Sequence, residues 1–310
     1  MIVLSFSLGN LFCSPQVNNL FASQRSDSSK KVDIYYNLIH DKRVTVSVYA
    51  SQDNGATWNL PITQISGDFG SGIDPGNGKH IIWDVLAEHP NIIFDNVKFK
   101  VVADDGVIDL ASGLVAYYPF NGNANDVSGC GNHGSVSGSV LCPDRFGVPN
   151  KAYYFSGNNN FITINHSNVL NLQDMTLSLW VKFDRTNTGE IFLSKGMFPD
   201  YNYKFEIYYN YLRFIVGLNN DQSMAQVRGY QTGVWYFLTG THDGNTLKLY
   251  INGNLANSIP CVGLAAQNTY PLILGKYVDG GYCFKGTLDD IRVYNRVLAD
   301  SEIMSLYLGD

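Results

Sequence analysis

The chain has 310 residues, of which 45% are hydrophobic and 15% are charged, and its net charge is −6. This composition excludes a disordered chain, and the acidic balance argues against nucleic acid as a partner, because phosphate contacts need clusters of Lys and Arg. The 20 Tyr, 17 Phe and 30 Gly residues favour many short strands and turns over helical bundles. Beyond the N-terminus, no stretch stays apolar for the ~18 residues that a membrane-spanning helix needs. We therefore expect an all-β chain with no membrane span.

Residues 1–15, MIVLSFSLGNLFCSP, are interpreted as the remnant of a secretory signal peptide. They have its apolar centre but lack the positively charged start, so a segment of another kind stays open as the alternative. Export by a bacterial-type route, to the medium or the cell surface, is the localisation that this interpretation predicts.

Residues 16–104 contain β-branched and aromatic runs separated by turns, at 31–38, 43–50, 80–85 and 97–103. They predict a small β-sandwich, and the segment resembles the immunoglobulin-like and fibronectin type III-like modules of bacterial exported proteins. Residues 51–58, SQDNGATW, match the Asp-box pattern of sialidases, but a propeller would repeat the motif and the chain has one copy. We interpret it as a local hairpin. The polar stretch 105–112 is the predicted linker.

Four further cysteines suit an exported protein with disulfides. Local pairing of Cys130 with Cys142 and of Cys261 with Cys283 is the simplest of three connectivities. A zinc site is the alternative, which the absence of a CxxC motif disfavours.

Residues 113–310 predict a second, larger sandwich. Segments 113–134 and 286–298 are expected to form its first and last strands, side by side, and Asn252-Gly253 is a hairpin signal. Residues 298–308 form the one convincing helical pattern. Ala299, which cannot cap, precedes this pattern, so either Asp300 caps the helix or its first turn frays.

Five segments of this region carry a family resemblance when taken in order. They are GLVAYYPFNGNANDVSGCGNHG, DRFGVPNKAYYFSGNNNFITI, MTLSLWVKF, WYFLTGTHDGNTLKLYINGN and GTLDDIRVYNRVLADSEIMSLY. Together they resemble the concanavalin A-like, laminin G-type jelly roll over nearly all of residues 113–310. The expected fold is thus an immunoglobulin-like or fibronectin-like sandwich followed by a jelly-roll sandwich with one short C-terminal helix.

The resemblance implies a structural calcium site in some relatives, and its ligands here would be Asp126, Asn132 and Asp289. Calcium binds six to eight oxygen atoms, which this loop offers in quantity. The alternative is that Asp126 and Asn132 cap turns while Asp289 bonds loop amides.

Ligand binding is the predicted role of two aromatic loops, 197–203 and 276–284. Sugar sites on such sandwiches stack pyranose faces on aromatic rings, so the candidates are Tyr201, Tyr203, Tyr277 and Tyr282. The alternative for each is that its ring packs on neighbouring strands. Trp180 and Trp235 lie within strand patterns and are expected in the core.

Catalysis is not predicted. Glycosidases need two carboxylates flanking the scissile bond, whereas Glu190, Glu206 and Glu302 are isolated, and Glu206 is expected on a solvated face. The leading hypothesis is a non-catalytic binding or adhesion protein for a glycan or an extracellular protein. The alternative is a structural subunit that self-associates through strand edges into a filament or surface layer, helped by a flexible segment at 16–30. A glycoside hydrolase or a sialidase-related enzyme is less well supported.

Overall fold

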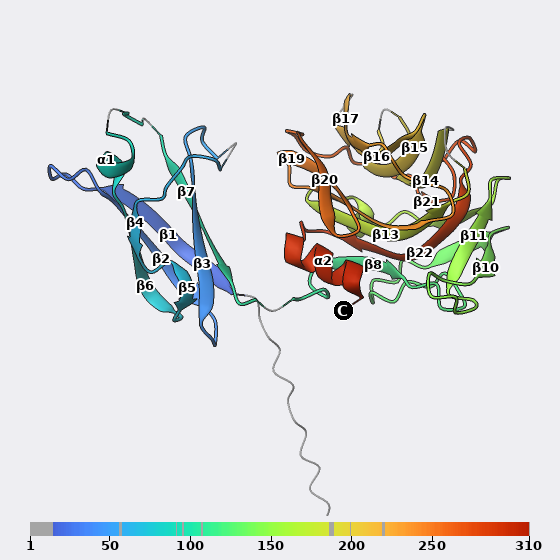
Figure 1. Cartoon of the computed structure of the whole chain (residues 1–310), viewed down its shortest axis with the longest axis horizontal. Helices are drawn as coiled ribbons and strands as arrows, with labels where there is room; N and C mark the ends of the chain where they lie inside the picture. Colours follow the sequence, from blue (N-terminus) through green and yellow to red (C-terminus); the bar gives the residue numbers. More distant parts are fainter. Residues whose placement is uncertain are drawn as a thin grey trace, which may run out of the picture. The chain divides into compact units, whose positions relative to one another are not determined.

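A computed structural model describes residues 15–55, 58–90, 92–94, 96–106, 108–185, 189–198, 200–218 and 221–309. It divides into two compact units, Met1–Asp109 and Leu110–Asp310, each with its own hydrophobic core (Figure 1). The division falls between Asp109 and Leu110. The predicted leader lies outside the described residues except for Pro15.

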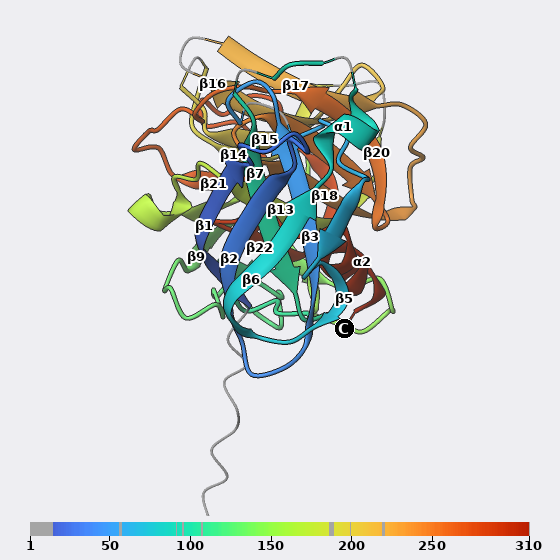
Figure 2. The same ribbon diagram turned by 90° about the vertical axis from the view of Figure 1, so that its left-hand side faces the viewer.

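The first unit consists of two antiparallel sheets, with strand orders β1-β2-β6-β4 and β5-β3-β7 (Figure 2). Their elements are β1 (Gln16–Gln24), β2 (Val32–Ile39), β3 (Val44–Ser51), β4 (Ile65–Gly67), β5 (Gly70–Ile73), β6 (Gly76–Trp83), α1 (Val85–Glu88) and β7 (Lys98–Asp104). Alternate residues of β2, including Ile34 and Tyr36, are buried and meet Val46 of β3 in the core. This two-residue period places one face of each sheet inward.

The N-terminal part of this unit corrects one prediction. Residues 16–30 were expected to be flexible, but Gln16–Gln24 form β1, which pairs with β2 in antiparallel register. The sequence QVNNLFASQ lacks alternation of buried residues, because most of the strand lies exposed at the sheet edge. The hairpin interpretation of the Asp-box is supported by Ser51, whose hydroxyl oxygen accepts the Gly55 amide at 2.8 Å.

The second unit is a sandwich of two larger antiparallel sheets. One has the order β10-β11-β22-β13-β18-β19-β20 with β8 also paired to β22, and the other has the order β17-β16-β15-β14-β21-β12-β9. Their strands are β8 (Leu114–Tyr118), β9 (Gly134–Ser137), β10 (Val140–Cys142), β11 (Ala152–Ser156), β12 (Phe161–Ile164), β13 (Met175–Phe183), β14 (Gly189–Lys195), β15 (Tyr203–Tyr208), β16 (Tyr211–Leu218), β17 (Asp221–Val227), β18 (Trp235–His242), β19 (Thr246–Ile251), β20 (Asn254–Pro260), β21 (Leu272–Leu274) and β22 (Lys285–Tyr294). Two helices, η1 (Asn168–Leu170) and α2 (Asp300–Leu308), complete the unit.

The core of the second unit lies between its two sheets. Inward residues of β13, such as Leu177 and Leu179, share one apolar cluster with Phe205 and Phe214 from the opposite sheet. A smaller cluster under α2 contains Trp180, which is buried as predicted, whereas Trp235 is only partly buried against this cluster. In Figure 1, α2 lies beside β8, on the side of the eight-stranded sheet that faces away from β14–β17.

The predicted meeting of the first and last strands is confirmed. β8 pairs with β22 in antiparallel register, with Tyr118 opposite Ile291. The predicted helix is also confirmed as α2, but its cap differs from the prediction. The Glu302 carboxylate accepts the Ala299 amide at 2.8 Å, whereas Asp300 accepts the Tyr250 hydroxyl at 2.8 Å. Asp300 therefore ties the helix to β19 instead of capping it.

The cysteines also depart from the prediction, because the four that the structure describes all carry free thiols. The members of each predicted pair have different surroundings. Cys130 lies near the Leu114 carbonyl, while Cys142 lies in β10, where burial raises its pKa. Cys261 is buried, and the Cys283 thiol lies near the Gly280 carbonyl. Neither local bridge is formed.

No helix within the described ranges is long and apolar enough to cross a membrane.

Candidate functional site

A groove lies on the outer face of the seven-stranded sheet of the second unit. Side chains of β15 alternate, so Phe205 and Ile207 enter the core while Lys204, Glu206 and Tyr208 face outward. β16 adds Arg213 and Ile215 to the same face, β14 adds Ile191, and β17 adds Gln222 and Met224. The sheet thus supplies a rigid floor of mixed polarity.

Two loops form the walls of the groove, and they bring together three of the four predicted tyrosines. Tyr201 comes from one loop, with Phe198, and Tyr277 and Tyr282 come from the other. The enclosed volume is about 390 Å³, which is within the range of small-ligand sites. Tyr282 is 52% exposed at the rim, whereas Tyr201 and Tyr277 are buried in the walls.

Tyr203 is a correction to the predicted set. Its ring is fully buried in the core between the sheets, and its hydroxyl donates to the Leu170 carbonyl at 3.2 Å. It is the first residue of β15 and points inward, one position before the outward-facing Lys204. The alternative of packing among strands therefore holds for this residue.

A charged trio lies on the floor. Glu206 receives Lys204 Nζ at 3.0 Å and Arg213 at 3.4 Å, so two cations share one carboxylate. Lys204 Nζ also lies 4.8 Å from the centre of the Tyr201 ring and 5.8 Å from that of Tyr277. These cation–π distances join the floor to both aromatic walls. Counting the two cations against Glu206 leaves the trio one positive charge in excess.

The hydroxyl groups of the walls differ in their bonding. The Tyr277 hydroxyl accepts the Phe198 amide and so fastens one loop to the other. The buried Tyr201 hydroxyl has no hydrogen-bond partner among the described residues, and burial, together with the Glu206 charge, raises its pKa. A buried hydroxyl without a partner costs stability, and this one is out of reach of solvent in the wall of the groove.

The sequence interpretation missed the trio, and its expectation for Glu206 is wrong. Glu206 is only 7% exposed, because the long side chains of Lys204 and Arg213 cover its carboxylate. The alternation in YKFEIY is the signal that placed Lys204 and Glu206 on one face. Arg213 joins them only through the register of β15 and β16, in which it lies opposite Glu206.

The predicted calcium ligands form a different arrangement, away from the groove. Asp126 accepts the amides of Tyr117, Ser128 and Asn132, each at 2.9 Å. Burial alone would raise the pKa of Asp126, but these amides outweigh it and hold the pKa below its usual value. The Asn132 side chain donates to the Val115 carbonyl at 2.8 Å, so it too is engaged in closing the loop.

Asp289 has other partners. Its carboxylate accepts Arg145 at 3.1 Å and the Asp290 amide at 2.8 Å. No group of three or more His, Cys, Asp or Glu residues suited to a metal occurs in the part of the chain that the structure describes. The three amide bonds of Asp126 agree with the alternative of turn capping, whereas Asp289 bonds Arg145 and its neighbour in β22 and not the loop amides of that alternative. Calcium binding stays a prediction.

Residues 156–304 match the family described as the concanavalin A-like lectin/glucanases superfamily. The match includes β12 to β22, and so the strands β14–β17 that underlie the groove, but it leaves out β8, β9, β10 and nearly all of β11. This match lies wholly within the second unit. No curated protein matches the sequence.

Solved structures with a similar fold, at low sequence identity, include two toxin binding domains and one domain of an arabinanase. The binding domain of Paraclostridial Mosquitocidal Protein 1 has a TM-score of 0.56 and 18% identity, covering 64% of this chain and 52% of its own. The binding domain of botulinum neurotoxin serotype G has a TM-score of 0.54 and 18% identity, covering 63% and 50%. Domain 4 of AbnA, an extracellular arabinanase from Geobacillus stearothermophilus solved with arabinotriose, has a TM-score of 0.52 and 22% identity, covering 63% and 98%. This chain spans about half the length of the toxin domains that it matches.

Calcium binding can be tested directly through the stability of the second unit. Because the Asp126 oxygens are already bonded to three amides, we expect EDTA to leave its melting temperature unchanged, and calcium addition to do the same. Asp126→Asn should instead lower the melting temperature with or without calcium, since it weakens the amide bonds. A drop in EDTA that calcium reverses, and that Asp126→Asn abolishes, would restore the calcium prediction.

Proposed function

We propose that the second unit binds a glycan in the groove over β14–β17 and does not cleave it. The observation that carries this proposal is that Tyr201, Tyr277 and Tyr282 line one groove with Lys204 and Glu206, and that the Tyr282 ring is exposed at its rim. Aromatic rings stack on the apolar faces of pyranoses, while charged and amide groups bond the hydroxyl groups. The toxin binding domains and the arabinanase domain solved with arabinotriose, which have a similar fold, support the proposal.

The charge of the floor favours a saccharide that carries a carboxylate. Lys204 and Arg213 both bond Glu206, so a ligand carboxylate could take one cation while Glu206 keeps the other. Arginine suits this exchange because its planar guanidinium offers several donors at once. Affinity for such a ligand should fall as the salt concentration rises.

The floor also argues for binding without hydrolysis. Glycoside cleavage commonly uses two carboxylic acids about 5 to 9.5 Å apart. Glu206 is the one carboxylate among the described lining residues, and it is held by two cations. We therefore expect no release of reducing sugar from any glycan that binds.

A glycan array with matched variants tests the proposal. Tyr282→Ala removes an exposed rim ring, and we expect it to weaken binding about ten-fold without lowering the melting temperature. Arg213→Gln should weaken the binding of acidic glycans more than the binding of neutral glycans. Phe146→Ala is the control, since Phe146 is 74% exposed and is not a lining residue of the groove. Binding that Tyr282→Ala and Arg213→Gln leave intact would place the ligand elsewhere, and an array without any bound glycan would refute the proposal.

Export is a separate proposal, which rests on the apolar segment at residues 1–15. We propose that the protein works outside the cell, where glycans of other cells or of a matrix are accessible. Fractionation of cells that express the full chain tests this, and a protein that stays in the cytoplasm with its N-terminus uncut would contradict it.

A further inference from the structure

One strand of the first unit has an open edge. In the sheet β5-β3-β7, β7 pairs with β3 from Lys98 opposite Ser51 to Asp104 opposite Thr45. Across the described residues, no strand pairs with the other side of β7, although β1 of the other sheet lies close to part of it. A strand edge of seven residues offers a row of backbone donors and acceptors to another chain.

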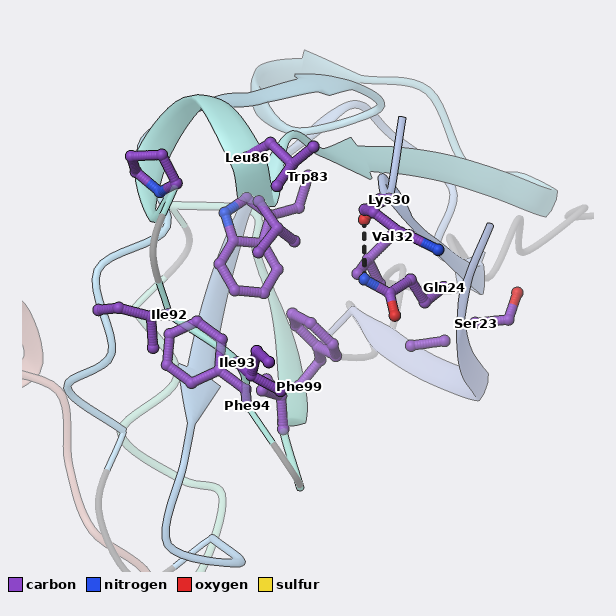
Figure 3. A pocket seen from close by; sticks show the side chains of 14 residues that line it. Ser23, Gln24, Lys30, Val32, Trp83, Leu86, Ile92, Ile93, Phe94 and Phe99 are labelled. Carbon is purple, nitrogen blue, oxygen red and sulfur yellow. Dashed lines mark hydrogen bonds between the residues drawn. The ribbon is translucent and has the colours of Figure 1, made fainter. Parts of the chain in front are cut away.

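An apolar pocket lies beside the start of this edge (Figure 3). It has a volume of about 610 Å³ and lies between Phe99 of β7, the end of β1 and the residues that follow β6. The rings of Trp83, Phe94 and Phe99 border it in Figure 3, with Leu86 and Ile92 near the opening. This space is large enough for one large side chain and its neighbours.

Hydrogen bonds fix both sides of the pocket. Trp83 is 1% exposed, and its indole nitrogen donates to Glu88 at 2.9 Å. Glu88 also accepts the Thr63 amide at 2.8 Å, which ties α1 to the sheet. On the other side, the Gln24 side chain donates to the Lys30 carbonyl at 3.0 Å, as the dashed line in Figure 3 marks. The pocket is therefore preformed, which lowers the ordering cost of binding.

The edge carries uncompensated positive charge. Lys98 and Lys100 are exposed on the face of β7 opposite to Phe99, and Lys30 lies at the mouth of the pocket. None of the three forms an ion pair within the described ranges. Lysines on an edge also discourage indiscriminate pairing of strands. The same charges would favour a strand whose outward residues are acidic, because opposite charges across a strand pair are stabilising.

We propose that β7 binds an extended segment of another polypeptide, which adds a strand to the sheet β5-β3-β7. A large apolar residue of that segment enters the pocket beside Phe99, and acidic residues on its outward face lie next to Lys98 and Lys100. Backbone hydrogen bonds supply affinity, while the pocket and the lysines select the partner sequence. This site belongs to the first unit and is independent of glycan binding.

Labelled synthetic peptides test each element of the proposal on the full chain. The probe is acetyl-Thr-Val-Glu-Phe-Glu-Val-Thr-amide, whose Phe and Val residues alternate with outward residues. Three matched peptides change one feature each: Lys in place of both Glu, Ala in place of Phe, and N-methylation of the backbone on the pairing side. We expect fluorescence anisotropy to show binding of the probe, weakened at least about ten-fold by each change. Hydrogen exchange should slow at amides of β7 when the probe is bound.

Charge exchange in the protein provides the decisive control. The double variant Lys98→Glu/Lys100→Glu should weaken binding of the Glu peptide and strengthen binding of the Lys peptide. Because both positions are exposed, the fold should persist. Lys151→Glu/Lys248→Glu in the second unit changes the total charge equally and should alter neither affinity. Failure of the probe to bind, equal binding of the N-methylated peptide, or unchanged exchange at β7 would overturn strand addition. Equal response to both double variants would reduce the effect to total charge and overturn the predicted placement of the acidic residues.

Discussion

Gly240→Ala is expected to destabilise the second unit by about 3 kcal/mol. Gly240 lies in β18 and faces Phe214 of β16 across the core, and a Cβ at this position would lie 2.4 Å from two atoms of the Phe214 ring. Carbon atoms pack at about 3.5–4.0 Å, so the ring or the two sheets would have to move. Such overpacking usually costs 1–3 kcal/mol and occasionally more, and here the opposing group is a rigid ring. Urea unfolding followed by circular dichroism measures the loss.

Two further variants separate this clash from a general effect of alanine. Combining Gly240→Ala with Phe214→Leu makes room for the added methyl group, so the double variant should be at least about 1 kcal/mol more stable than the sum of the single losses predicts. Gly281→Ala is the matched control, because its Cβ would meet only the flexible Asp279 carboxylate at 3.2 Å. Additive losses would show that the two positions do not compete for space.

The sandwich of the second unit could be predicted because its signals are local. Alternation in MTLSLWVKF and the turn at Asn252-Gly253 need no knowledge of distant residues. The close approach of Gly240 to Phe214 has no such signal, since WYFLTGTH resembles any buried strand with a glycine. It follows from the packing of two sheets and was visible only in the structure.

The groove shows the same limit. Loop composition predicted Tyr201, Tyr277 and Tyr282, but it could not separate them from Tyr203, which begins a strand and turns inward. The pairing of Glu206 with Arg213 depends on the hairpin between β15 and β16. The two turn residues of this hairpin, Tyr209 and Asn210, have positive φ angles of 45° and 65°, but they are not the usual Asn-Gly pair. The sequence therefore contains no signal for the register of β15 and β16, which places Arg213 opposite Glu206 on the floor of the groove.

Arg145→Met is expected to cost the second unit about 3 kcal/mol at pH 8 and much less at pH 5. The Arg145 guanidinium donates to Asp289 at 3.1 Å and to Asp290 at 2.8 Å, and it lies 4.5 Å from the centre of the Trp180 ring. Burial, and then the charge of Asp290, raise the pKa of Asp289 from 3.8 to about 7, while Arg145 opposes the rise. Without Arg145, an ionised Asp289 is a buried charge with no cation, a change that typically costs 3–5 kcal/mol.

The sign of the pH dependence follows from proton binding. Between about pH 4 and pH 7 the folded Asp289 holds a proton that the unfolded chain has released, so its contribution to stability falls as the pH rises through this window. The cost of burying the anion is complete above pH 7, and Arg145→Met makes that cost larger because the folded pKa rises further. At pH 5 the Asp289 carboxyl is protonated in both proteins, which leaves the loss of the contact between Arg145 and Trp180, about 1 kcal/mol, and of the bond between Arg145 and Asp290.

A double variant identifies the carboxylate that is responsible. Adding Asp289→Asn to Arg145→Met removes the buried charge, so it should recover most of the loss at pH 8 and flatten the difference between pH 5 and pH 8. The cycle compares four proteins: the unchanged protein, the two single variants Arg145→Met and Asp289→Asn, and the double variant. Their free energies of unfolding are measured in urea at both pH values, with EDTA present so that no metal neutralises Asp289. If Arg145→Met costs the same at both pH values, Asp289 does not ionise near neutrality in the folded domain. In that case Arg145 stabilises the domain through its contact with Trp180 and its bond to Asp290 alone.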